Sequence, residues 1–152
     1  MILRFRIPNG QMAIDLEVFI TKAGARRVKK MIRMYRESCP DSANIREVRG
    51  FLMELAQICQ EAVEENRSKR NQAAEEVQTA ERVYRRCSDH LKAAPSGLKT
   101  DWREKQKQIR ENWKDTKERL KACERKLAEA ERDRKACVEA IAVFNTEFEG
   151  WT

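Results

Sequence analysis

The feature that most constrains this chain is a row of mostly apolar residues, spaced chiefly three or four positions apart. Its members are Leu98, Trp102, Ile109, Trp113, Leu120, Cys123, Leu127, Ala130, Cys137, Ile141, Phe144, Phe148 and Trp151. This spacing puts side chains along one side of a helix, as in a coiled-coil seam. No Pro or Gly interrupts residues 98–149, so we expect a helix roughly 75 Å long. A helix of that length does not fit inside a compact enzyme of 152 residues, so it predicts an arm.

A second set of apolar positions predicts the partner helix of this arm. Its members are Ile45, Val48, Leu52, Leu55, Cys59, Ala62, Ala73, Val77, Ala80, Tyr84, Cys87, Leu91 and Ala94. Residues 64–72 are wholly polar, but they are helix formers, so the helix should continue through them. Asn44 followed by Glu47 is a capping-box-like start. Pro95-Ser96-Gly97 is the turn, and a short loop joins antiparallel neighbours.

This turn also predicts which layers of the two helices meet. Residues facing each other should have numbers that add up to roughly 192 to 196. Trp113 then lies opposite the small Ala80, and Cys59 shares a layer with Cys137. Large side chains opposite small ones are what helix packing requires.

The first residues have the alternation of a β-hairpin. Leu3, Phe5 and Ile7 precede Asn9-Gly10, a strong turn signal, and Met12, Ile14, Leu16 and Val18 follow it. The expected register sets Ile7 opposite Met12, Phe5 opposite Ile14, Leu3 opposite Leu16 and Arg4 opposite Asp15. Thr21 is the expected N-cap of a helix over residues 22–38, which Pro40 ends.

Together these patterns predict a mainly α protein with a small α+β head. Residues 1–40 would form the head, a β-hairpin and a basic helix packed on the open end of the arm. Residues 41–152 would form the long antiparallel coiled-coil hairpin, with its turn at 95–100, and the whole chain one folding unit. No run of eighteen apolar residues occurs, and the start lacks a signal-peptide pattern. A cytoplasmic protein is therefore expected.

The net charge of +7 is distributed unevenly. Residues 1–50 hold eleven Lys or Arg against five acidic residues, and residues 81–121 hold thirteen against seven. Basic residues of the first helix fall in one strip, with no acidic residue between Val18 and Arg36. This basic strip, the expected partner-binding site, comprises Lys22, Arg26, Lys29, Lys30, Arg33 and Arg36. A secondary patch at the arm tip comprises Arg85, Arg86, Lys92, Arg103 and Lys107.

Segregated positive charge indicates a polyanionic partner. The competing interpretation is a solvated helix face, which many basic coiled coils have. Trp102 and Trp113 are candidates for base stacking, but their seam positions also suit core residues. A membrane partner is not expected, because the apolar face of the basic helix is needed to cover the β-hairpin.

The residues that catalysis requires are missing from the sequence. The single histidine, His90, has no partner at catalytic or metal-ligating spacing. No Gly-rich phosphate loop or nucleophile motif occurs. The five cysteines are widely spaced without a C-x-x-C pair, which indicates free thiols in a reducing compartment. We therefore expect no enzyme activity, no cofactor and no metal.

The predicted function is a non-enzymatic helical protein that binds nucleic acid, or a nucleoprotein complex, through its basic surfaces. The partner would be nucleic acid or the acidic surface of a nucleic-acid-binding protein. One alternative is a protein-binding adaptor or inhibitor, such as a phage or mobile-element inhibitor of a host nucleic-acid enzyme, of the anti-CRISPR kind. Another is a structural coiled-coil homodimer.

Overall fold

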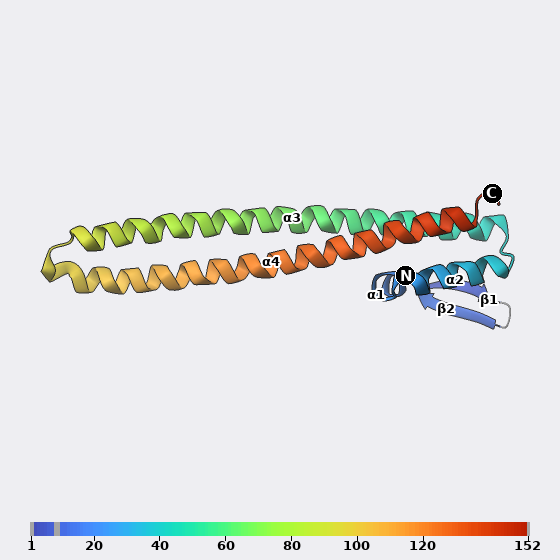
Figure 1. Ribbon diagram of the computed structural model, residues 1–152, viewed down its shortest axis with the longest axis horizontal. Helices are drawn as coiled ribbons and strands as arrows, with labels where there is room; N and C mark the ends of the chain where they lie inside the picture. Colours follow the sequence, from blue (N-terminus) through green and yellow to red (C-terminus); the bar gives the residue numbers. More distant parts are fainter. Residues whose placement is uncertain (1, 8–9, 152) are drawn as a thin grey trace. The chain divides into compact units, whose positions relative to one another are not determined.

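The computed structural model describes residues 2–7 and 10–151. These residues form two strands, four α-helices and one short 3-10 helix (Figure 1). The elements are β1 (Ile2–Ile7), β2 (Gly10–Asp15), α1 (Leu16–Lys22), α2 (Ala25–Glu37), α3 (Ser42–Ala93), η1 (Ser96–Leu98) and α4 (Lys99–Glu147). The protein is mainly α, with an N-terminal hairpin and two long helices, and this confirms the predicted fold class.

Residue contacts divide the chain into two compact units. We call residues 1–63 with 129–152 the head, and residues 64–128 the distal hairpin. Helices α3 and α4 each contribute to both units. The polar residues 64–72 lie inside α3, so the predicted continuity of that helix is confirmed. The predicted division of the chain between residues 40 and 41 stays a prediction. So does the prediction that the whole chain is one folding unit.

The β-hairpin of the head forms in a register two residues away from the predicted one. Its Cα partners are Ile2 and Asp15, Leu3 and Ile14, Arg4 and Ala13, Phe5 and Met12, Arg6 and Gln11, and Ile7 and Gly10. The predicted register was therefore wrong. It would have placed Pro8 in the ladder opposite Gln11, although proline has no N–H to donate. The observed register leaves residues 8 and 9, which lie outside the described residues, between Ile7 and Gly10.

Strand β2 ends earlier than predicted because Asp15 begins a helix. Its carboxylate accepts a 3.2 Å hydrogen bond from the backbone N–H of Val18, which makes it the N-cap of α1. Leu16 and Ile20, one helical turn apart, are each 1% exposed in the core of the head. The strand was expected to reach Val18, but residues 16–18 are helical instead. The helix is favoured because Asp15 caps it and because Leu16 and Ile20 become buried.

The basic helix predicted over residues 22–38 forms as α2, which begins three residues later. Gly24, not Thr21, occupies the N-cap position. Thr21 lies within α1, where its hydroxyl donates a 2.8 Å hydrogen bond to the carbonyl of Glu17. The helix ends at Glu37, ahead of Pro40 as predicted.

Helix α3 begins at Ser42 and is capped by Asp41 instead of the predicted Asn44. Asp41 accepts a 2.7 Å hydrogen bond from the backbone N–H of Asn44 and so caps the helix. The side chain of Asn44 has another partner, because its Oδ1 accepts a hydrogen bond from the hydroxyl of Tyr35. That contact joins α2 to the start of α3 and leaves Asn44 no role as a cap.

The core of the head is formed by all four helices. Three aromatic rings lie at its centre: Tyr35 and Phe148 have centroids 5.5 Å apart, and Phe144 and Phe148 have centroids 4.6 Å apart. Each of the three side chains is at most 1% exposed. Burial of this kind raises the pKa of Tyr35. The apolar face of α2, comprising Val28, Met31, Ile32 and Tyr35, is buried here, and this fixes its basic face outward.

Both units have the predicted antiparallel helix register. In the head, the sulfur atoms of Cys59 and Cys137 lie 3.4 Å apart, so the predicted shared layer is confirmed. In the distal hairpin, the side-chain amide of Gln106 donates a 3.0 Å hydrogen bond to the hydroxyl of Ser88. Their residue numbers add up to 194, which lies within the predicted range. Trp113 stacks on Tyr84, one turn along α3 from the expected Ala80.

Candidate nucleic-acid interface

The basic strip of the head is exposed along its full length. Lys22 ends α1, and the other members lie on α2. All six side chains, Lys22, Arg26, Lys29, Lys30, Arg33 and Arg36, are exposed. They lie outward because the opposite face of α2 packs into the core.

The fold divides this strip into two parts. Glu147, at the end of α4, accepts hydrogen bonds from Nε of Arg33 at 2.9 Å and from Nη1 of Arg36 at 3.2 Å. The hydrogen bond from Arg33 is the main cause that lowers the pKa of Glu147. The guanidinium of Arg36 also lies 5.6 Å from the ring centroid of Trp151. One carboxylate thus partly compensates these two arginines.

The remaining part of the strip keeps its charge. Lys22, Arg26, Lys29 and Lys30 form no ion pair with any residue in the described part of the chain. These four exposed cations, one at the end of α1 and three on α2, repel one another, and an anionic partner would relieve that repulsion.

The arm-tip patch belongs to the distal hairpin, with Arg85, Arg86 and Lys92 on α3 and Arg103 and Lys107 on α4. All five side chains are exposed. Arg85 pairs with Glu81 one helical turn away at 2.7 Å, a local pair that contributes little to stability at an exposed site.

Two patch members belong to a longer line of cations along α4, which we call the α4 row. Its members are Arg103, Lys107, Arg110, Lys114, Lys117 and Lys121, and all are exposed. They follow each other at intervals of four, three, four, three and four residues. At 100° per residue they fall within an arc of about 80°, and the row is about 27 Å long. Sequence reasoning missed the last four, although this regular spacing of basic residues was visible in the sequence.

Few members of the α4 row form an ion pair in the described part of the chain, although Glu104, Glu111 and Glu118 lie three or four positions from its lysines. Lys121 pairs with Glu118 at 3.2 Å, whereas Arg103, Lys107 and Lys114 form no ion pair within residues 2–7 and 10–151. Arg110 donates a 2.9 Å hydrogen bond to the hydroxyl of Tyr84. This hydrogen bond lowers the pKa of Tyr84.

Aromatic rings flank the row. Nζ of Lys117 lies 3.6 Å from the ring centroid of Trp113, which itself stacks on Tyr84 with centroids 5.1 Å apart. Trp102 stacks on His90 at 5.1 Å, with Nζ of Lys105 5.0 Å away. Both tryptophans are half-buried. Trp113 contacts a member of the row, Lys117, whereas Trp102 contacts Lys105, which is not a member.

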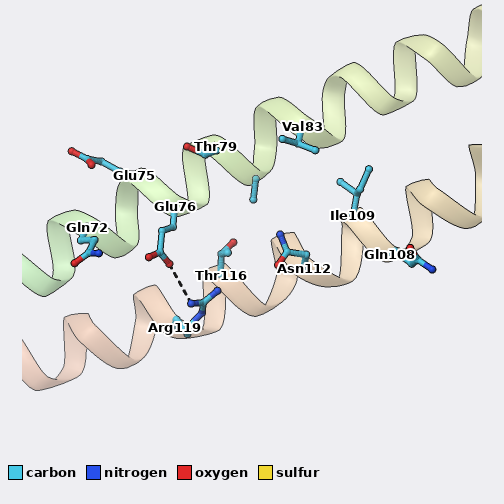
Figure 2. Close-up of a pocket in the computed structure, with 11 residues that line it drawn as sticks. Gln72, Glu75, Glu76, Thr79, Val83, Gln108, Ile109, Asn112, Thr116 and Arg119 are labelled. Carbon is cyan, nitrogen blue, oxygen red and sulfur yellow. Dashed lines mark ion pairs between the residues drawn. The ribbon is translucent and has the colours of Figure 1, made fainter.

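A hollow between α3 and α4 of the distal hairpin contains none of the row's members (Figure 2). Its wall holds Glu75 and Glu76 as well as Arg119, which pairs with Glu76 at 3.3 Å. The full lining is Gln72, Glu75, Glu76, Thr79, Ala80, Val83, Gln108, Ile109, Asn112, Thr116 and Arg119.

Within residues 2–7 and 10–151, no cluster of three His, Cys, Asp or Glu side chains has the arrangement to hold a metal ion. None of the five cysteines, all of which lie in the described residues, forms a disulfide bond. None of the described helices combines the length and the apolar character needed to cross a membrane.

No curated protein and no solved structure matches the chain. A family model matches residues 66–147, which include most of the distal hairpin, the whole α4 row and the end of α4. The match covers more than half of the chain, and the protein therefore belongs to the family described as "Protein of unknown function (DUF725)".

Proposed function

We propose that the protein is a non-enzymatic binding protein that holds nucleic acid through its phosphate backbone, with the α4 row as the main contact. The observation that carries this proposal is the line of six exposed cations within one narrow arc of α4. A side-by-side series of Lys and Arg is the electrostatic footprint of a protein that binds phosphates.

The dimensions of the row suit a nucleic-acid strand. Successive row members are about 4.5 or 6 Å apart along the helix axis. A strand of duplex DNA presents one phosphate per about 3.4 Å of axis. Because the strand also winds around that axis, a straight row about 27 Å long meets only the phosphates on the side that faces α4. Long flexible Lys side chains can adjust to the difference between the two repeats, and contacts of this kind do not depend on base sequence.

The basic strip of the head supports the same function. Lys22, Arg26, Lys29 and Lys30 are four further exposed cations without a carboxylate partner among the described residues. Each phosphate contact adds to the affinity through release of counterions. We propose the strip as a second contact surface on the head, and a cytoplasmic location as part of the same proposal.

The test is binding of a labelled DNA duplex of about 20 base pairs, long enough to cover the row, measured by fluorescence anisotropy at several salt concentrations. The row variant replaces Arg103, Lys107 and Lys114 by Gln. Removing three phosphate contacts should reduce the magnitude of the slope of log affinity against log salt by about 2.7. The helical content of the variant should stay the same as that of the wild type.

A matched control separates the row from net charge. Replacing Lys126, Arg132 and Lys135 by Gln changes the net charge equally, from +7 to +4, at exposed α4 positions outside the row. This control should keep most of the slope. If the slope falls equally in the row variant and in the control, DNA is bound only through non-specific attraction to the net positive charge. Salt-independent capture of a protein instead of DNA would favour the alternative, an adaptor or inhibitor of a nucleic-acid enzyme.

A further inference from the structure

Two buried thiols face each other in the core of the head. The sulfur atoms of Cys59 on α3 and Cys137 on α4 are 3.4 Å apart, although 78 residues separate them in the chain. Cys59 is 8% exposed and Cys137 is 1% exposed. A disulfide bond is about 2.05 Å long, so the two sulfur atoms need to approach by only about 1.4 Å.

We propose that Cys59 and Cys137 form an intrachain disulfide site that hydroperoxide oxidises and that a thiol reductant reopens. The crosslink would join α3 to α4 at the centre of the head. The other cysteines are placed differently: Cys39 is exposed, Cys87 is buried and Cys123 is half-buried. None of these three has another cysteine within hydrogen-bonding distance in the described part of the chain.

The chemistry takes two steps. The Cys59 thiolate attacks one oxygen of the hydroperoxide, the O–O bond breaks, and the leaving oxygen departs as water or alcohol with the thiol proton. This gives a sulfenic acid at Cys59. The Cys137 sulfur then attacks the Cys59 sulfur, the S–O bond breaks, and water leaves with the Cys137 proton. Two thiols lose two electrons and two protons, and the hydroperoxide takes up both.

The surroundings assign the order of these steps. Burial raises the pKa of both thiols, that of Cys137 to about 12. Cys59 is the more exposed, and its hydrogen bond with Cys137 offsets part of the effect of burial. Cys59 is therefore the first to react. Scarcity of thiolate makes the reaction slow at neutral pH and faster at higher pH.

The bond should stabilise the head. It closes a long loop of the chain, and a crosslink of this kind restricts the unfolded state more than the folded one. Because the sulfur atoms already lie in one layer, the folded state has little to rearrange. The melting temperature of the oxidised protein should exceed that of the reduced protein by roughly 10 °C.

The experiment treats the full-length protein with hydrogen peroxide, blocks remaining thiols after unfolding, and maps the linked peptides by mass spectrometry. We expect Cys59 linked to Cys137 as the main product, with a higher melting temperature that dithiothreitol reverses. Cys87→Ala is the matched control, because it removes a different buried thiol and should keep both results. Cys137→Ala should lose both.

Two outcomes would overturn the proposal. One is a wild-type peptide map in which Cys39 is oxidised or linked between molecules while Cys59 and Cys137 stay reduced. The other is an oxidation-dependent rise in melting temperature that survives in Cys137→Ala. The wild-type map decides even where a variant folds poorly, because it requires no substitution.

Discussion

Arg33 on α2 donates a 2.9 Å hydrogen bond to Glu147 at the end of α4, 114 residues further along the chain. The Arg33 side chain is 56% exposed and that of Glu147 only 12%. The carboxylate is thus held close against the head while the guanidinium stays at the surface. This contact, with the second one from Arg36, sets how much of the basic strip's charge is available to a partner.

Glu147→Gln should therefore strengthen nucleic-acid binding by the head. The substitution removes one negative charge and leaves Arg33 and Arg36 without their carboxylate. We expect a steeper dependence of affinity on salt, by about one to two further phosphate contacts. Anisotropy titrations with the DNA duplex measure this. Glu139→Gln, an exposed carboxylate elsewhere on α4, is the matched control, and an equal gain there would assign the effect to net charge alone.

The same carboxylate should make stability depend on pH. The folded-state pKa of Glu147 is lowered from its ordinary value near 4.5. The unfolded state therefore takes up the proton first as the pH falls, so the stabilisation is present above about pH 4.5 and is lost below it. Urea unfolding of the wild type and of Glu147→Gln should differ by at most about 1 kcal/mol at pH 7, because the arginine of the pair is largely exposed to solvent. A difference that stays constant to pH 3 would contradict this assignment.

Phe148→Ala should destabilise the head strongly. Phe148 is 0% exposed and packs against the rings of both Tyr35 and Phe144. Loss of a buried ring typically costs about 3 to 5 kcal/mol, because the transfer energy is lost and a cavity remains. Chemical denaturation measures the change. Val138→Ala on α4, where the side chain is 55% exposed, should stay within about 0.5 kcal/mol of the wild type.

Ala80→Trp should loosen the distal hairpin and leave the head intact. Ala80 is 6% exposed on α3 and lines the hollow between α3 and α4. A tryptophan there overfills the seam, which typically costs about 1 to 3 kcal/mol. Hydrogen exchange followed by mass spectrometry should show faster exchange in residues 64–128. Equally fast exchange in residues 16–37 would mean that the two units unfold together.

The helices and their register were largely predictable, because their determinants repeat along the sequence. Apolar residues at helical spacing, the turn at Pro95-Ser96-Gly97 and the lack of breakers each act over a few residues. Once the turn is placed, the register of an antiparallel pair follows. The layer of Cys59 and Cys137 was accordingly correct across 78 residues.

The ends of the N-terminal elements were less predictable, because several local signals compete there. Asn9-Gly10 and Pro8-Asn9 are both plausible turns, and the strand continued to alternate past Asp15. The structure ends β2 at Asp15, which caps α1, and places Leu16 and Ile20 in the core. Burial of these side chains outweighed the alternation, since the apolar contacts of a core exceed differences in local propensity.

In the candidate interface too, the sequence determined some features and the packing of the helices decided others. The sequence by itself determined that cations lie on one side of α2 and in a row along α4, because a helix converts spacing into direction. Only the tertiary structure decided which of these charges are compensated. Glu147 reaches Arg33 and Arg36 through packing of the end of α4 on α2, and Tyr84 reaches Arg110 across the distal hairpin. Such contacts depend on the separation of side chains in space, and the local sequence carries no information on that separation until the helices have packed.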